Sequence, residues 1–176
     1  MAVILAITGG VVLLFLITAL RGAPYVPTHR SSLSILFDEL LPVSEKDLVV
    51  DIGSGDGVVL RAAAQRGARA LGYELNPVLV GISKALSIRY GMRVTIRFAD
   101  FWLVEFPPET TVVYTFGETR DIVRMYQKVA NEAVRLQKTI HFVSYAFTID
   151  GVTPIRSKHA MNVYRVSPSS SSLQGE

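Results

Sequence analysis

Between residues 43 and 166, short apolar runs alternate with longer segments in which apolar residues recur with a helical period. The apolar runs predict strands at 48–51, 70–74, 94–98, 111–116 and 139–147, and a last strand at 160–166 that pairs antiparallel with its predecessor. The periodic segments predict helices at 58–66, 77–90 and 121–137. This alternation is typical of an α/β fold, with a parallel sheet and helices on both faces. Because few residues follow position 147, we expect a shorter C-terminal strand region than a full seven-stranded sheet has.

The N-terminal segment 2–20 is rich in Val, Ile and Leu and carries no charged residue. A helix of this length, rising about 1.5 Å per residue, can just cross a hydrocarbon core of about 30 Å. We therefore predict a transmembrane anchor at 1–21, with a buried core helix as the alternative. Arg21, His29 and Arg30 follow the span and no charge precedes it, so the positive-inside tendency places the domain on the cytoplasmic side.

Residues 22–42 connect this span to the domain. Pro24 and Pro27 predict a stiff, extended lead-in. A helix is expected at 33–41, capped by Ser31 or Ser32, with one apolar face formed by Leu33, Leu36, Phe37 and Leu40. The domain itself is expected at 43–166, and the serine-rich tail 167–176 is predicted to be disordered.

The turn between the strand 48–51 and the helix 58–66 contains Gly53, Gly55 and Gly57. Glycines allow a ligand to approach the backbone closely, and the start of the helix offers free N–H groups. The spacing differs from the G-x-G-x-x-G of dinucleotide sites, and no Gly-Lys-Ser/Thr ending is present. Asp51 before the turn would repel a pyrophosphate but suits a ligand with an ammonium group, such as S-adenosylmethionine (SAM). The alternative is an ordinary strand-to-helix turn whose acids cap helices.

Two further acids follow the next two predicted strands. Glu74 ends the strand 70–74, where a carboxylate can accept hydrogen bonds from both ribose hydroxyls. Asp100 follows the strand 94–98 and is expected to bind the adenine amino group, with Phe101 and Trp102 covering the adenine face. Three acids at the ends of three successive strands therefore predict a SAM site.

The motifs DIGSGDG (51–57), GYELNP (72–77) and ADFW (99–102) resemble those of class I SAM-dependent methyltransferases, which have a Rossmann-like fold. Together with the apolar span and PYVPT (24–28), they resemble the membrane-anchored protein-lysine methyltransferases of mitochondria over about residues 24–164. Members of that family modify the adenine nucleotide translocase and the c subunit of ATP synthase. The resemblance implies that SAM is the cofactor. The SAM-binding residues expected from motif and resemblance are Asp51, Gly53, Ser54, Gly55, Gly57, Glu74, Asn76, Asp100, Phe101 and Trp102.

The residues at the end of the strand 111–116 are expected to indicate the class of methyl acceptor. Amide and adenine N-methyltransferases carry Asn/Asp-Pro-Pro-aromatic there, whereas this chain has Phe116 followed by the segment 117–120, which also departs from the more apolar continuation of the lysine methyltransferases. Glu118 is the candidate catalytic residue, because it could orient a lysine ammonium or help it lose a proton. A capping acid for the helix 121–137 is the alternative. Tyr25, Thr28 and Tyr145 are candidates for the acceptor channel.

Composition excludes several other classes of site. The chain has no cysteine, and its three histidines lack metal-ligand spacing, so no metal site is predicted. The net charge of +3 is spread over single Lys and Arg residues, which argues against a nucleic-acid partner.

We therefore predict a membrane-anchored, SAM-dependent protein-lysine N-methyltransferase whose substrate is a protein at or in the membrane. Methyl transfer to a lipid headgroup amine or a quinone precursor is an alternative, and a non-catalytic SAM-binding scaffold is another. The missing basic amphipathic presequence favours a prokaryotic inner membrane over a mitochondrial membrane.

Overall fold

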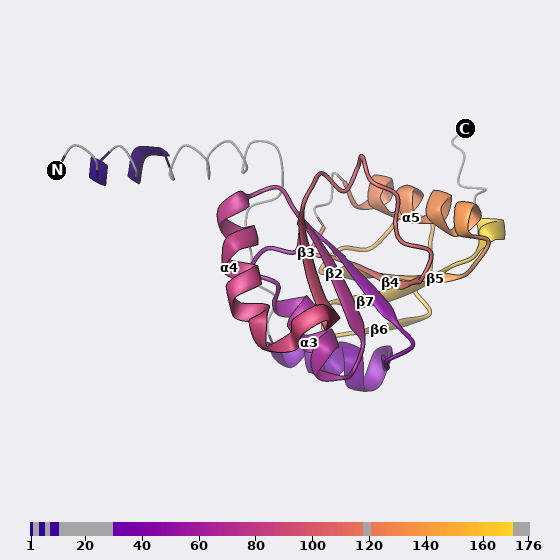
Figure 1. Ribbon diagram of the computed structural model, residues 1–176. Helices are drawn as coiled ribbons and strands as arrows, with labels where there is room; N and C mark the ends of the chain where they lie inside the picture. Colours follow the sequence, from indigo (N-terminus) through magenta and orange to yellow (C-terminus); the bar gives the residue numbers. More distant parts are fainter. Residues whose placement is uncertain (2–3, 6–7, 11–29, 118–120, 171–176) are drawn as a thin grey trace.

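The computed structural model describes residues 1, 4–5, 8–10, 30–117 and 121–170 (Figure 1). The predicted membrane span and the lead-in after it lie mostly outside these residues. Within the described residues, no helix combines the length and the apolar character needed to cross a bilayer.

The centre of the fold is a sheet of seven strands in the order β3-β2-β1-β4-β5-β7-β6. The strands are β1 Leu48–Ile52, β2 Arg69–Glu74, β3 Val94–Phe98, β4 Thr110–Thr115, β5 Ile140–Tyr145, β6 Arg156–Lys158 and β7 Met161–Val166. β1 to β5 pair in parallel, whereas β7 is antiparallel to both β5 and β6. The predicted α/β class and the antiparallel last strand are therefore confirmed.

The expected shortening of the C-terminal strand region is wrong, because β6 completes a seven-stranded sheet. β6 has only three residues, all exposed, and pairs with β7 at an edge of the sheet. Its sequence, Arg-Ser-Lys, contains no apolar residue and hence gives no strand pattern.

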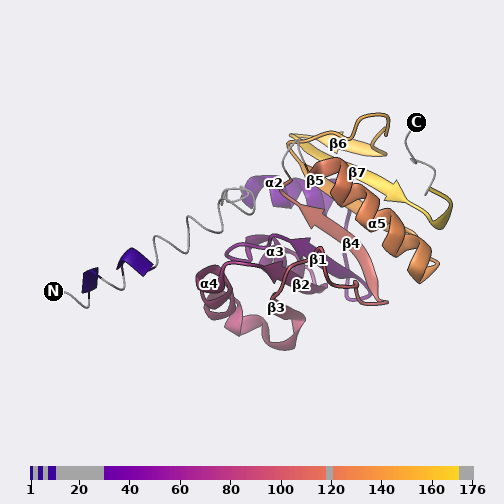
Figure 2. The same cartoon turned by 90° about the horizontal axis from the view of Figure 1, so that it is seen from above.

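Helices cover both faces of the sheet, as predicted (Figure 1). The helical segments are α2 Arg30–Ser34, η1 Ile35–Leu40, α3 Val58–Gln65, α4 Pro77–Ser87, η2 Ile88–Arg93, α5 Ile122–Leu136 and η3 Pro168–Ser170. α2, η1, α3 and α4 share one buried core with the sheet, and α5 shares the other. Figure 2 shows β3 and β6 at opposite edges of the sheet. η3 contacts α5, and residues 171–176 of the predicted tail lie outside the described residues.

The predicted N-terminal helix is present with its expected apolar face, since Leu33, Leu36, Phe37 and Leu40 are all buried. It starts earlier than expected, at Arg30, so Ser31 and Ser32 lie inside it rather than capping it, and its second half is a π-helix. Polar contacts fasten that half to the domain. Asp38 pairs with Arg66 at the end of α3, Glu39 pairs with Lys158, and the Leu40 carbonyl accepts from Arg156.

Gly72 in β2 allows α3 to pack closely on the sheet. A Cβ at this position would lie 2.5 Å from Ser54 Oγ and 2.6 Å from Leu60 Cδ1. We expect Gly72→Ala to lower the free energy of unfolding by about 1–3 kcal/mol through overpacking. The matched control is Gly81→Ala on α4, where a Cβ meets nothing within 4 Å. This variant should gain about 0.5–1 kcal/mol from the higher helix propensity of alanine.

Urea denaturation of both variants measures the difference. Equal unfolding free energies for Gly72→Ala and Gly81→Ala would show that α3 does not pack on β2 as closely as described.

Candidate functional site

The three predicted acids lie together at the carboxyl edge of the parallel sheet. Asp51 is in β1, Glu74 ends β2, and Asp100 follows β3 by two residues. β2 pairs with β1 on one side and with β3 on the other, so the three strand ends are neighbours. Open α/β sheets bind their ligands at this edge.

The glycine turn is fastened to β2 by its backbone. The N–H groups of Gly53 and Ser54 both donate to the Tyr73 carbonyl, each at 3.0 Å. Gly53 and Gly57 have φ of +79°, in the left-handed region that favours glycine. The two positions differ in their surroundings, because a Cβ at Gly53 would meet nothing within 4 Å, whereas one at Gly57 would lie 2.2 Å from Ser83 Oγ. Gly53 therefore faces open space at the mouth of the turn, while Gly57 packs against α4.

Ser54, a predicted cofactor-binding residue, has its side chain turned into the protein. Its Oγ is buried near Gly72 and has no hydrogen-bond partner among the described atoms. Only the backbone of Ser54 therefore takes part in the shape of the turn.

The Glu74 carboxylate is held between the glycine turn and the start of α4. Its Oε2 accepts from the Gly55 N–H at 2.8 Å, and its Oε1 accepts from the Asn76 N–H at 2.7 Å. An ionised carboxylate has about four acceptor positions, so each oxygen keeps capacity for one more donor. Two oxygens fixed in this way fit the two neighbouring hydroxyls of a ribose.

Asn76 is a helix cap in the structure. Its Oδ1 accepts from the N–H groups of Val78 at 3.0 Å and Leu79 at 3.4 Å, and Pro77 occupies the first turn of α4. This geometry accounts for Asn-Pro after β2 as a helix start. Through the bond from its own N–H to Glu74, Asn76 also positions the Glu74 carboxylate.

Asp51 is buried at 2% exposure beside two other acids. Burial, followed by the charges of Glu74 and Asp56, raises the pKa of this carboxyl well above its usual range. A ligand ammonium group placed here would stabilise the ionised form. The site therefore favours a cation.

The raised pKa predicts how stability changes with pH. Between the unfolded-state pKa and the higher folded-state pKa, the folded protein keeps a proton on Asp51 that the unfolded chain has released. This contribution is full below the unfolded-state pKa and is lost as pH rises through the folded-state pKa. We expect Asp51→Asn to remove this decline and to raise the free energy of unfolding at neutral pH.

Urea denaturation over a pH series tests this expectation, with Asp150→Asn as the exposed control. An Asp51→Asn variant whose stability declines with pH as steeply as that of the unaltered protein would contradict it.

After β3, Asp100 shapes a turn that carries two aromatic rings. Its Oδ1 accepts from the Trp102 N–H at 2.9 Å, and the rings of Phe101 and Trp102 lie 4.4 Å apart between centroids. The Arg124 guanidinium of α5 lies 4.2 Å from the centroid of the Trp102 ring. Trp102 thus has one face occupied by α5, and only its remaining surface is available to an adenine ring.

On the other side of the turn, an aromatic pair follows β4 and ends β5. The rings of Phe116 and Tyr145 lie 5.0 Å apart, both partly exposed. Because β4 is the neighbour of β1, this pair faces the side of the site opposite to Glu74. Phe116 was not among the predicted site residues, although an aromatic at a strand end was a signal for it. Glu118, Tyr25 and Thr28 lie outside the described residues.

The family model of the ANTKMT methyltransferase domain matches residues 51–156 of this chain. A lysine N-methyltransferase of Xenopus laevis, named for the c subunit of ATP synthase, is 35% identical over 144 residues, which cover 80% of this chain and 61% of that protein. A protein-lysine N-methyltransferase of Saccharolobus islandicus is 31% identical over 135 residues, which cover 74% of this chain and 81% of that protein. The chain spans about half to three fifths of the vertebrate enzymes named for the ATP synthase c subunit that it matches.

Among solved structures, an RNA methyltransferase from Salinibacter ruber in complex with S-adenosyl-L-homocysteine has a TM-score of 0.65 and 28% identity. The match covers 81% of this chain and 94% of that structure.

Proposed function

This chain belongs to the ANTKMT methyltransferase family, and we propose that it transfers a methyl group to the ε-amino nitrogen of a lysine in a protein. S-adenosylmethionine is its cofactor. The observation that carries the proposal is the Glu74 carboxylate, which the N–H groups of Gly55 and Asn76 hold in place beside the glycine turn. The choice of lysine is supported by the relatives from Xenopus laevis and Saccharolobus islandicus, which are both lysine methyltransferases.

Different residues of the site bind different parts of the cofactor. Glu74 binds the ribose hydroxyls, Asp51 stabilises the ammonium group, and Gly53 lets the ligand approach the backbone. Asp100 and Phe101 line the part of the site that takes the adenine ring. SAM supplies a methyl group on a sulfonium sulfur, which a neutral amine accepts by in-line displacement as the carbon–sulfur bond breaks. The protein therefore contributes mainly by positioning the two partners and excluding water.

The acceptor lysine is proposed to enter along Phe116 and Tyr145. They lie at the ends of β4 and β5, on the opposite side of β1 from Glu74, and this is the side where we place the acceptor. An aromatic surface suits the aliphatic stem of a lysine and attracts its ammonium head. Glu118, after Phe116, is proposed to take the ammonium proton before the attack.

Tyr145→Ala tests the acceptor side without disturbing the cofactor. We expect methyl transfer to fall on the order of tenfold, because a displaced acceptor loses alignment, while SAM affinity stays unchanged. Tyr145→Phe keeps the ring and should retain most of the rate. If SAM affinity fell together with the rate in Tyr145→Ala, the ring would belong to the cofactor side instead.

We further propose that residues 2–20 anchor the enzyme in a membrane with its domain facing the cytoplasm, as in a prokaryotic inner membrane. The support is the uncharged apolar stretch and the basic residues that follow it. The substrate would then be a protein at or in that membrane, since anchoring raises the effective concentration of both. Relatives named for the c subunit of ATP synthase and for the adenine nucleotide translocase support a membrane substrate.

The substrate class is tested by incubating the purified chain with methyl-labelled SAM and unmethylated membranes from its source. Protein, lipid and RNA fractions are then separated and counted, with Glu74→Ala as the control. The proposal expects label in a protein band, absent with the variant. Label only in the lipid extract would establish a lipid or quinone-precursor methyltransferase, and label in RNA would establish an RNA methyltransferase. SAM binding without label in any fraction would indicate a scaffold.

A further inference from the structure

An apolar surface remains exposed at the β3 edge of the sheet, over α4 and η2. The exposed large apolar residues there are Leu75, Ile82, Leu86, Ile88, Met92 and Phe98. Ile88 and Met92 project into solvent, with exposures of 83% and 97%. We call this surface the α4 face. Ile82 and Leu86 lie four residues apart on α4, so their side chains are neighbours on one side of the helix. Exposed apolar surface of this kind often marks a site of interaction.

The composition of α4 shows that this exposure is not a by-product of core packing. The helix packs Leu79 and Val80 against the sheet, while Ile82 and Leu86 lie on its outer side. A surface helix of a soluble domain normally presents polar residues outward. α4 carries apolar residues on both sides, so we expect its outer side to contact a partner rather than water.

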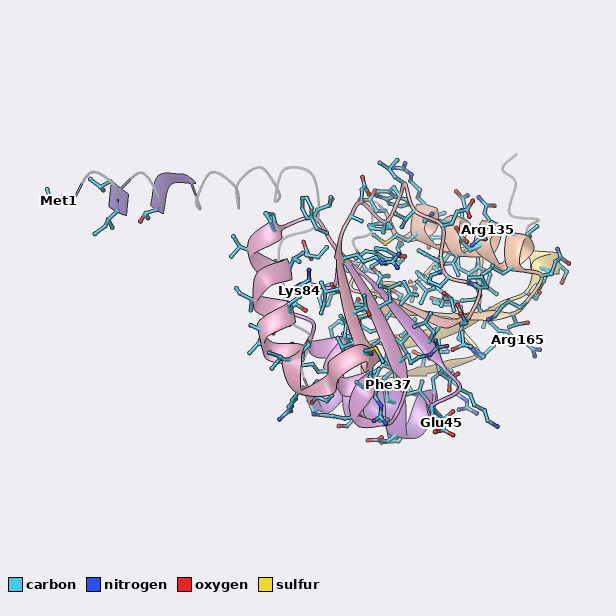
Figure 3. All side chains as sticks on the ribbon, in the orientation of Figure 1. Met1, Phe37, Glu45, Lys84, Arg135 and Arg165 are labelled. Carbon is cyan, nitrogen blue, oxygen red and sulfur yellow. The ribbon has the colours of Figure 1, made fainter. Side chains whose placement is uncertain are left out.

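The charged residues of the segment 75–99 indicate which class of partner covers the α4 face. Residues 75–99 contain Lys84, Arg89, Arg93 and Arg97 and no acidic residue. All four are exposed, and Lys84, Arg89 and Arg93 lie on α4 and η2 (Figure 3), whereas Arg97 in β3 interacts with Tyr73 on the other face of the sheet. A matching partner therefore has an anionic surface and an apolar interior.

Two occupants from this chain itself fit poorly. A two-fold contact between copies would place the same basic residues opposite one another. The N-terminal segment 1–29 contains no acidic residue, so it offers no charge to match.

We propose that the α4 face is a peripheral membrane-binding surface that docks on anionic lipid. Apolar side chains enter the boundary between headgroups and acyl chains, and the surrounding Lys and Arg pair with lipid phosphates. Long basic side chains suit this position because their stems lie along apolar surface while their charges stay in water. The proposal concerns the domain alone and does not depend on the methyl acceptor or on the N-terminal anchor.

The experiment uses the full chain in vesicles and reads single positions. Because the chain has no cysteine, Ile82→Cys and Met92→Cys each accept one environment-sensitive fluorophore. Ile155→Cys is the matched control, since Ile155 is an exposed isoleucine beside β6 at the opposite edge of the sheet. Quenching is measured with nitroxide-labelled lipid and with neutral acrylamide, in phosphatidylcholine vesicles with and without phosphatidylglycerol.

In anionic vesicles, lipid quenching at positions 82 and 92 is expected to exceed that at 155 by about twofold or more, with acrylamide quenching reduced to match. The double reversal Lys84→Glu with Arg93→Glu should abolish the difference. Lys46→Glu, which alters an exposed residue before β1, should leave the difference unchanged. Equal lipid quenching at 82, 92 and 155 would overturn the proposal. Protection from acrylamide without lipid quenching would also overturn it, because a second copy of the chain would then cover the face.

Discussion

Replacing Glu74 by alanine is expected to weaken SAM binding by about a hundredfold or more. The carboxylate offers two hydrogen bonds to the ribose, and bonds to a charged group contribute about 1.5–3 kcal/mol each. Its oxygens are already fixed by the N–H groups of Gly55 and Asn76, so the wild-type site needs little reorganisation on binding. Isothermal titration calorimetry with SAM measures the loss directly.

Glu109→Ala provides the matched control, because it removes an exposed carboxylate in the loop before β4. It should leave SAM affinity unchanged. Wild-type affinity in a folded Glu74→Ala variant would place the ribose elsewhere and remove the main support for the site.

The second large effect is expected at the glycine turn, where two positions form a matched pair. Gly53 and Gly57 share a φ of +79°, so alanine at either should cost about 1–2 kcal/mol of stability from backbone strain. At Gly57 the new Cβ also meets Ser83 Oγ at 2.2 Å, which adds about 1–3 kcal/mol of overpacking. Adding Ser83→Ala to Gly57→Ala should return its stability to the level of Gly53→Ala.

Measuring SAM affinity in Gly53→Ala and Gly57→Ala separates the effect on ligand binding from the effect on stability. Gly53 faces open space, so Gly53→Ala should weaken SAM binding by obstructing the approach of the ligand, although its stability loss is the smaller one. Urea denaturation and calorimetry on the same preparations give both values. Unchanged SAM affinity in Gly53→Ala would mean that the ligand does not cross the turn at this point.

Most of the fold could be predicted because its strands are apolar and buried. β3 has the predicted bounds, β1 and β2 are each longer than predicted by one residue, and β4 is shifted by one residue. β6 could not be found, since its three polar residues give no apolar pattern and are held by pairing with β7 and by polar contacts with η1. The π-helical form of η1 was likewise not predicted, and the ion pairs that η1 makes with Arg66 and Lys158 join segments distant in sequence.

At the site, topology made Asp51, Glu74 and Asp100 predictable as a group. Acids at the carboxyl ends of neighbouring parallel strands must meet at one edge of the sheet. Contacts between distant segments could not be predicted in the same way. The bond from the Gly55 N–H to Glu74 and the position of Arg124 over Trp102 both depend on tertiary packing.

A lysine methyltransferase leaves the transferred methyl group on a lysine nitrogen. The most direct test is to hydrolyse the labelled membrane protein to amino acids and to identify the labelled residue by mass spectrometry. We expect label in methyl-lysine, formed by the unaltered chain and not by Glu74→Ala. Label in any other amino acid would contradict it.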